Sequence, residues 1–321
     1  MRLPPENTVA ATVAAIDVGG TFIKGGLVAP GGAIEARQSV PTLAHEGHRA
    51  VVERIAGLGR ELAAAQAAAG AGPRRLGVVI PGLVDERRGI AIRAANLDWA
   101  DYPIAEVLSR RIGLSVAIGH DVAAGALAEY RYGAAAGAEV AVVAAIGTGV
   151  AAGLICRGRP YRGAHGRVLE LGHLRLAWSD EPCGCGGRGC LERVAAASAI
   201  AIRHARAAGL ARPLDAKQVQ ALARRGDPIA AQVWADAVRA LAQGLATVVT
   251  LADPDRIVVA GGLSRAGDSL LTPLRAELAG LLTLPMAPAV VAARLGSDAG
   301  LVGAAIAAGL ESDPRDLTAQ E

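Results

Sequence analysis

Short apolar runs that end at turn residues set the pattern of the first part of the chain. Residues 13–16 are apolar and lead directly to Asp17 and a glycine pair, and residues 23–29 form a second run of strand length. Two such runs separated by a short turn predict a hairpin. The alanine-rich segment 44–69 has the periodicity of a helix, and residues 76–80 predict a buried strand closed by a Pro-Gly pair.

Strands and helices continue to alternate along the rest of the chain. The pattern predicts strands at 115–118, 139–146, 151–156 and 257–260, helices at 102–112, 123–132 and 300–308, and mainly helical sequence over 191–251. This alternation is typical of an α/β fold. A strand pair with a glycine turn occurs twice, at 17–21 and at 146–149, which indicates a faint internal duplication.

The length of the chain predicts more than one hydrophobic core. At 321 residues the chain is longer than a domain with a single hydrophobic core usually is, so we expect two lobes. The helix at 300–308 is wholly apolar and must be buried. We place the N-terminal α/β lobe at residues 1–120 together with the C-terminal helix region 300–321, and the C-terminal α/β lobe at residues 121–299.

Composition narrows the class of protein. Hydrophobic residues make up 52% and charged residues 20%, which indicates a globular protein and not a disordered one. The net charge of +3 is too small to indicate a nucleic-acid partner. Because only two of the 33 basic residues are lysines, we expect phosphates to be held mainly by backbone N–H groups.

Neither a targeting segment nor a membrane span is indicated. Residues 1–10 lack the apolar stretch of a signal peptide, and the apolar stretch 140–155 is broken by glycines. We therefore expect a cytoplasmic protein with no membrane partner. In that reducing setting the four cysteines serve as metal ligands or core residues rather than as disulfides.

Two glycine turns are candidate phosphate-binding segments. Glycines after a strand let backbone N–H groups approach phosphate oxygens, and a carboxylate at the strand end can hold Mg²⁺ directly or through water. An ordinary hairpin turn has the same residues, so that interpretation stays open for each turn alone. The first turn comprises Asp17, Gly19, Gly20 and Thr21, and the second comprises Gly147, Thr148 and Gly149.

An aspartate just past a buried strand is the candidate catalytic base. Asp121 follows His120 at the end of the predicted strand and precedes a predicted helix. A carboxylate in this place can accept the proton of an attacking hydroxyl group. The alternative is that Asp121 is only the N-cap of the helix.

A cluster of metal ligands follows in the second half of the chain. Three thiolates and one imidazole, from Cys183, Cys185, Cys190 and His173, make a closed tetrahedral set, which predicts a structural Zn²⁺ ion. Disulfide or redox chemistry is the alternative. Cys156 lies in an apolar strand, and we expect it to be a core residue.

Further polar residues beside these segments can contact a sugar. Glu170 and Glu192 flank the zinc ligands, and carboxylates can grip sugar hydroxyl groups through two hydrogen bonds. The Asn96 amide offers both a donor and an acceptor. The alternatives are a pair of solvated surface glutamates and a turn asparagine.

In their order, these segments resemble the ROK family (repressors, open reading frames and sugar kinases), within the hexokinase, actin and heat-shock-70 fold group. The resemblance runs from about residue 13 to residue 308, nearly the whole chain. It implies a two-lobed actin-like ATPase (ribonuclease H-like) fold with an interlobe cleft. The segments that carry it are Asp17-Val18-Gly19-Gly20-Thr21, Asn96-Leu97-Asp98-Trp99, Asp121, Gly147-Thr148-Gly149, Arg162-Gly163-Ala164-His165-Gly166, Glu170-Leu171-Gly172-His173, Gly189-Cys190-Leu191-Glu192, Val259-Ala260-Gly261-Gly262-Leu263-Ser264 and Gly296-Ser297-Asp298-Ala299-Gly300.

The resemblance implies a role for each site residue. Both glycine turns would handle the phosphates of ATP and Mg²⁺, with Gly261 and Gly262 beside the adenosine. Asp121 would take the proton of the sugar 6-hydroxyl group. The sugar would be bound by Asn96, His120, Glu170, His173 and Glu192. Family members are commonly homodimers or homotetramers.

Three departures from the family pattern bear on the sugar. The family usually has an asparagine that touches the sugar immediately before the base, and here that residue is His120. Imidazole still offers one hydrogen bond, with a different reach and protonation. Residues 150–152 replace a glycine-rich stretch, and Leu169 replaces a glycine.

We therefore expect a glucokinase-like enzyme that phosphorylates a hexose at the 6-hydroxyl group. The near alternative is an N-acetylmannosamine or N-acetylglucosamine kinase, and polyphosphate is an alternative donor that lacks a supporting run of basic residues. From another class, a sugar-binding regulator without activity would carry a helix-turn-helix domain ahead of the kinase-like part. We expect no such domain, because Asp17 comes so early in the chain.

Overall fold

The computed structural model describes residues 12–68, 75–283 and 287–310. The chain forms two compact units, unit 1 (Met1–Ala128 and Asp298–Glu321) and unit 2 (Glu129–Ser297). The chain thus crosses between units at 128/129 and 297/298, where the sequence analysis placed the crossings at 120/121 and 299/300. The N-terminal segment 1–10, the predicted helix end near residue 70 and the tail 311–321 lie outside the described residues.

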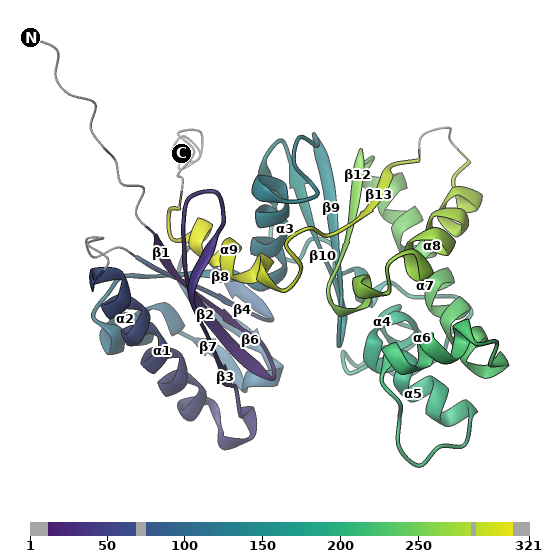
Figure 1. Cartoon of the computed structure of the whole chain (residues 1–321), viewed down its shortest axis with the longest axis horizontal. Coiled ribbons are helices and arrows are strands. Elements are labelled where there is room, and N and C mark those ends of the chain that lie inside the picture. The colour runs from purple at the N-terminus through teal and green to yellow at the C-terminus, as the bar shows by residue number, and fades with distance from the viewer. Residues whose placement is uncertain (1–11, 69–74, 284–286, 311–321) are drawn as a thin grey trace, which may run out of the picture. The chain divides into compact units, whose positions relative to one another are not determined.

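Unit 1 is built on a five-stranded sheet in the order β3-β2-β1-β4-β8 (Figure 1). Strands β1 (Val13–Val18) and β2 (Phe22–Val28) form the predicted hairpin, and β3 (Ile34–Pro41) extends it antiparallel to β2. Strands β4 (Leu76–Ile80) and β8 (Val116–His120) run parallel to β1. The carboxyl ends of β1, β4 and β8 therefore lie at the same edge of the sheet.

Helices cover both faces of this sheet. On one face, α1 (His48–Ala68) packs so closely that a Cβ atom on Gly25 would lie 2.9 Å from its leucine side chains. On the other face, α9 (Ala299–Ala307) approaches β4 until a Cβ atom on Gly77 would lie 1.8 Å from the carbonyl oxygen of Ala304. The two glycines pair with neighbouring residues of β1, which point to opposite faces. The burial predicted for the apolar C-terminal helix is confirmed.

A small antiparallel sheet that the sequence did not predict follows β4. It consists of β5 (Leu83–Asp85), β6 (Ile90–Ala94) and β7 (Trp99–Tyr102) in that order. Helix α2 (Ile104–Ile112) then returns the chain to β8. Helix α3 (Asp121–Tyr132) begins directly at the end of β8.

Unit 2 repeats the sheet of unit 1. Its strand order is β11-β10-β9-β12-β13, with the first three strands antiparallel and with β12 and β13 parallel to β9. Order and directions match those of β3-β2-β1-β4-β8, so the predicted duplication is confirmed at the level of topology. The strands are β9 (Val140–Ile146), β10 (Val150–Cys156), β11 (Arg159–Tyr161), β12 (Arg256–Ala260) and β13 (Ala289–Ala292).

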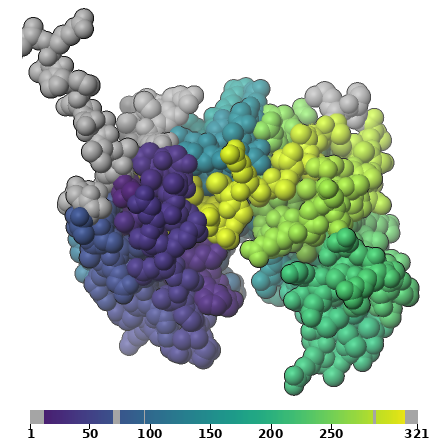
Figure 2. Space-filling model, viewed as in Figure 1, coloured from purple at the N-terminus to yellow at the C-terminus, as the bar shows by residue number. Residues whose placement is uncertain are grey.

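The core of unit 2 lies between this sheet and a group of helices. Helix α7 (Pro228–Ala252) is the longest described, and its start is fixed by the side chain of Asp227, which accepts from the N–H of Ala230 at 2.7 Å. None of the helices described combines the length and hydropathy needed to cross a membrane. The other helices are α4 (Glu192–Ala195), α5 (Ala197–Ala207), α6 (Ala216–Arg224) and α8 (Asp268–Leu281), with α5 and α6 at the surface in the green segment of Figure 2.

Candidate functional site

The glycine turn of unit 1 is held by hydrogen bonds from inside and outside the turn. The N–H of Gly19 donates to the carbonyl oxygen of Phe22 at 2.9 Å. Thr42, which is fully buried, donates from Oγ1 to the carbonyl oxygen of Gly19 at 2.7 Å and from its N–H to that of Thr21 at 2.8 Å. Thr42 therefore fixes the shape of the turn, and the sequence analysis did not find it.

Asp17, near the end of β1, is a partly buried carboxylate at the first turn of α9. A Cβ atom on Gly300 would lie 2.5 Å from its Oδ2 atom, so only glycine leaves room for the carboxylate there. Burial raises the pKa of Asp17 to about 6, while Lys24 lowers it and the charge of Asp121 raises it. A carboxylate in this state gains from a nearby cation, as expected of a residue that helps to hold Mg²⁺.

The predicted base Asp121 is the first residue of α3. Its Oδ1 atom accepts from the N–H of Val122 at 2.7 Å. The N–H of Ala123 donates instead to Nδ1 of His120 at 3.3 Å, so His120 caps this turn of the helix. The other ring nitrogen, Nε2 of His120, lies 3.4 Å from Oδ1 of Asp121.

The electrostatic environment of Asp121 combines opposing effects. Burial raises the pKa of the Asp121 carboxyl group, while His120 and the N–H of Val122 lower it. Glu86 also belongs to this environment, because its Oε1 atom accepts from the backbone N–H of His120 at 3.1 Å. The sequence analysis missed Glu86, which stands in a run of charged residues that resembles a solvated turn.

Asn96 lies beside the glycine turn within unit 1. It is exposed in the 3₁₀ turn Ala95–Leu97, and its Nδ2 atom would lie 3.9 Å from a Cβ atom on Gly20. Unit 1 thus brings the amide predicted to contact a sugar next to the turn predicted to contact phosphates.

The glycine turn of unit 2 is anchored to the start of α5. The N–H of Gly147 donates to the carbonyl oxygen of Gly149 at 2.9 Å, which closes the turn. The N–H of Ala197 donates to the carbonyl oxygen of Gly147 at 2.8 Å, and Oγ of Ser198 donates to that of Thr148 at 2.6 Å. The turn is therefore held from its carbonyl side, as the first turn is held by Thr42.

The predicted adenosine segment lies next to the end of β9, which leads into this turn. Gly261 has a φ of 79°, and a Cβ atom there would lie 2.4 Å from the carbonyl oxygen of Ile146. Nothing lies within 4 Å of the Cβ position of Gly262. The close approach and the positive φ together require glycine at position 261. The short distance to Ile146 also shows that the two predicted ATP segments of unit 2 lie side by side.

The predicted metal ligands of unit 2 form one cluster. The ligand atoms of His173, Cys183, Cys185 and Cys190 all lie within 4.8 Å of one another, with Sγ of Cys185 and Cys190 separated by 3.6 Å and Cys183 Sγ 3.9 Å from His173 Nδ1. A tetrahedral Zn²⁺ ion with bonds of about 2.3 Å spaces its sulfur ligands about 3.8 Å apart. The four cysteines of the chain are free thiols, and the donor set fits a structural zinc ion.

One prediction about the cysteines is wrong. Cys156 was expected in the core, but it is exposed. It is the last residue of β10 and pairs with Arg159, the first residue of β11, which is also exposed. The strand reaches the surface at this end, so its final side chain is not buried although the strand is apolar.

The two glutamates lie beside the metal cluster. Glu192 Oε1 lies 3.1 Å from Cys183 Sγ, and its Oε2 atom would lie 3.2 Å from a Cβ atom on Gly149. Glu192 therefore connects the cluster to the glycine turn. Glu170 is exposed, and its carbonyl oxygen accepts from the N–H of His173 at 2.9 Å. Unit 2 brings the carboxylate of Glu192 and the backbone of Glu170 next to the predicted zinc ligands.

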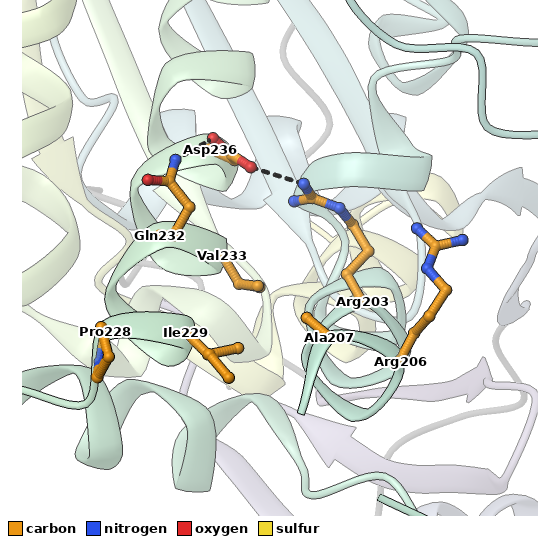
Figure 3. Close-up of a pocket in the computed structure, with 8 residues that line it drawn as sticks. All are labelled: Arg203, Arg206, Ala207, Pro228, Ile229, Gln232, Val233 and Asp236. Carbon is orange, nitrogen blue, oxygen red and sulfur yellow. Dashed lines mark hydrogen bonds and ion pairs between the residues drawn. The ribbon is translucent and has the colours of Figure 1, made fainter. Parts of the chain in front are cut away.

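A surface pocket between α5 and α7 contains none of the predicted site residues (Figure 3). Arg203 donates to Asp236 at 2.6 Å, and Gln232 donates to the same carboxylate at 2.9 Å. The arginines that line the pocket are both paired with acidic side chains of the same unit. We therefore assign this pocket no part in the chemistry.

The duplicated sheet order and the glycine turns at matching strand ends define a protein of the actin-like ATPase fold. The chain belongs to the ROK family, whose family model matches residues 13–309. It is 34% identical to the glucokinase of Streptomyces coelicolor over 93% of this chain and 98% of that protein. The resemblance found in the sequence motifs and the predicted fold class are confirmed.

Solved structures of the same family give the same result. The ROK hexokinase from Thermus thermophilus is similar with a TM-score of 0.77 and 35% identity, over 94% of this chain and 98% of that one. A ROK family glucokinase from Streptomyces griseus, solved in complex with glucose and AMPPNP, is similar with a TM-score of 0.79 and 32% identity, over 92% of this chain and 98% of that one.

Proposed function

We propose that this protein is an ATP-dependent hexose kinase that phosphorylates the sugar 6-hydroxyl group with Asp121 as the general base. The observation that carries the proposal is the position of Asp121, a partly buried carboxylate at the junction of β8 and α3 with His120 beside it. The glucokinase relatives, among them one solved with glucose and AMPPNP, support the choice of hexose and ATP.

The residues of the two glycine turns would hold the phosphates and Mg²⁺. Backbone N–H groups suit this task, because neither turn contains a lysine and nothing lies within 4 Å of the Cβ position of Gly147. Asp17 would hold the magnesium ion directly or through water, and the bound ion would stabilise the charge on the phosphates. The proposed nucleotide residues are Asp17, Gly19, Gly20, Thr21, Gly147, Thr148 and Gly149 for the phosphates, and Gly261 and Gly262 for the adenosine.

The sugar would be held by Asn96, Glu170, His173 and Glu192. Glu192 is supported in this role by its position between the metal cluster and the glycine turn of unit 2. A structural zinc ion on the three cysteines and His173 would fix the loop that carries these side chains. It would thereby fix which hydroxyl groups the carboxylates can reach.

In the reaction, Asp121 accepts the proton of the 6-hydroxyl group while that oxygen attacks the γ-phosphorus of ATP. The bond from the γ-phosphorus to the bridging oxygen breaks, ADP leaves, and Asp121 passes its proton to solvent. A raised pKa suits this work, because a base takes up a proton more readily as its pKa approaches the working pH.

An ADP-release assay with Mg-ATP against glucose, mannose, fructose, N-acetylglucosamine and N-acetylmannosamine tests the proposal. We expect the highest kcat/KM on glucose, and we expect Asp121→Asn to lower kcat by about 10²- to 10⁴-fold without loss of fold. Preference for an N-acetylhexosamine would replace the sugar assignment. Sugar binding without turnover by zinc-replete protein would identify a sugar-binding regulator instead.

The location and assembly of the protein stay predictions. We propose a cytoplasmic enzyme that forms a homodimer or homotetramer, in line with the sequence analysis. Light scattering of the purified protein on a sizing column measures the oligomeric state, and a monomeric mass would contradict this part of the proposal.

A further inference from the structure

His120 is held from several directions. It is the last residue of β8 and pairs with Ile80 of β4, and its backbone N–H donates to Oε1 of Glu86 at 3.1 Å. Its ring accepts the N–H of Ala123 through Nδ1 at 3.3 Å. Because strand pairing, a carboxylate and a helix N-terminus all act on this one residue, the imidazole has a defined orientation.

The contact with Ala123 decides which ring nitrogen carries hydrogen. A nitrogen that accepts a hydrogen bond bears no proton, so the neutral ring carries its hydrogen on Nε2. That atom lies 3.4 Å from Oδ1 of Asp121, at an ion-pair distance that is longer than an ordinary hydrogen bond. The Nε2 side of the ring therefore lies beside the carboxylate, and its partial positive charge favours the ionised form of Asp121.

We propose that His120 is a positioning residue for Asp121, whose carboxylate it orients. The inference rests on the proposed kinase function with Asp121 as base. Nδ1 of the ring accepts the N–H of Ala123, and Nε2 lies 3.4 Å from Oδ1 of Asp121. An asparagine in this place, as in the family pattern, has the shorter side chain and lacks the Nε2 position.

The charged groups around Asp121 define what a pH profile would report. His120 precedes it on the chain, the charge of Asp121 raises the pKa of Asp17 of β1, and Glu86 is bonded to the backbone of His120. Asp17 and Glu86 are unchanged in every variant below. A difference in the pH profile between two of these variants therefore reports the change at position 120.

Two substitutions separate the two contacts of the ring. In His120→Asn the amide oxygen occupies the position of Nδ1, so it can still accept the N–H of Ala123, but nothing replaces Nε2. In His120→Gln the amide nitrogen can occupy the position of Nε2 and donate to Asp121, while the acceptor for Ala123 is lost. His120→Ala loses both contacts.

The test measures kcat and the sugar KM of these proteins between pH 5 and pH 9, on the sugar that the wild type phosphorylates best, and the Tm of each. We expect the acidic limb of kcat to move up by about half a pH unit or more in His120→Asn and His120→Ala, and to stay in place in His120→Gln. We expect the Tm to fall by about 2–4 °C in His120→Gln and His120→Ala, and to stay in place in His120→Asn.

Two results would overturn the inference. One is an acidic limb that is the same in all four proteins, which would leave His120 with no effect on the base. The other is an increase of about tenfold or more in the sugar KM of His120→Ala with an unmoved acidic limb, which would make the ring a sugar ligand. Wild-type protein that phosphorylates none of the sugars would contradict the proposed function itself, before any variant is compared.

Discussion

Gly300 and Asp17 approach so closely that a Cβ atom on the glycine would lie 2.5 Å from Oδ2 of the carboxylate. The relationship joins the first turn of α9 to the end of β1, two segments from opposite ends of the chain. The absence of a side chain at position 300 therefore leaves the space that the predicted magnesium-binding carboxylate occupies.

Gly300→Ala should therefore displace the Asp17 carboxylate. We expect kcat/KM for ATP to fall about tenfold or more, because small displacements of a phosphate-side group are costly. The matched control is Gly57→Ala, in the interior of α1, where nothing lies within 4 Å of the added atom. That change should preserve activity and stabilise the fold by about 0.5–1 kcal/mol. Steady-state kinetics of Gly300→Ala equal to those of the wild type would contradict the assigned contact.

Asp17→Asn should raise stability while it removes activity. The pKa of Asp17 is about 6 in the folded protein against an ordinary value of 3.8, so the folded state retains a proton that the unfolded chain releases. The stability from this proton is fully present below about pH 4 and is lost as the pH rises through about 6. Without this titration, the variant should melt increasingly above the wild type between pH 4 and pH 7.

Melting curves recorded in buffer without added magnesium measure this difference and leave the predicted zinc site loaded. Subtraction of the wild-type Tm from the variant Tm at each pH isolates the contribution of Asp17 to the pH dependence of the Tm, because the other titrating groups are the same in both proteins. A difference that is constant with pH would show that Asp17 ionises in the folded protein as it does in the unfolded chain.

Cys185→Ser should lose zinc and stability together. Metal analysis should find about one zinc ion per chain in the wild type and clearly less in the variant, with a Tm lowered by about 5 °C or more. Cys156→Ser is the control, because Cys156 is an exposed free thiol outside the cluster. A folded Cys185→Ser protein with a full zinc complement would count against the site.

Gly261→Ala should be far more harmful than Gly262→Ala. The first change places a Cβ atom 2.4 Å from the carbonyl oxygen of Ile146 at a φ of 79°, whereas the second meets nothing within 4 Å. Backbone strain of this kind costs about 1–3 kcal/mol, and the clash adds to it. Urea unfolding of both variants measures the difference, and equal midpoints would show that the loop relaxes freely.

Local patterns were sufficient to predict the parts of the site that are contiguous in the chain. The strand before Asp17, the cysteine run and the strand-to-helix junction at Asp121 each carry their signal within a few residues. The repeated glycine turn predicted the duplication that the two sheets display. These features depend on strand length, turn residues and ligand spacing, which are all visible without tertiary contacts.

Residues that act across the fold could not be predicted in this way. Thr42 binds a turn 23 residues earlier, and Glu86 binds a backbone N–H 34 residues later. No local pattern marks a threonine after a strand or a glutamate in a charged run. The small sheet of β5, β6 and β7 was missed because its short strands carry exposed polar residues such as Arg93. Cys156 was misplaced because strand pattern alone does not tell where a strand reaches the surface.

The cysteine cluster also has a practical consequence for anyone who produces this protein. The cluster lies outside the sheets, so protein from a zinc-starved expression host would keep its sheets while the loop proposed to hold the sugar is poorly anchored. Low specific activity in such a batch would then reflect metal supply during growth and not the choice of sugar. Metal loading is therefore the first quantity to report beside any turnover number.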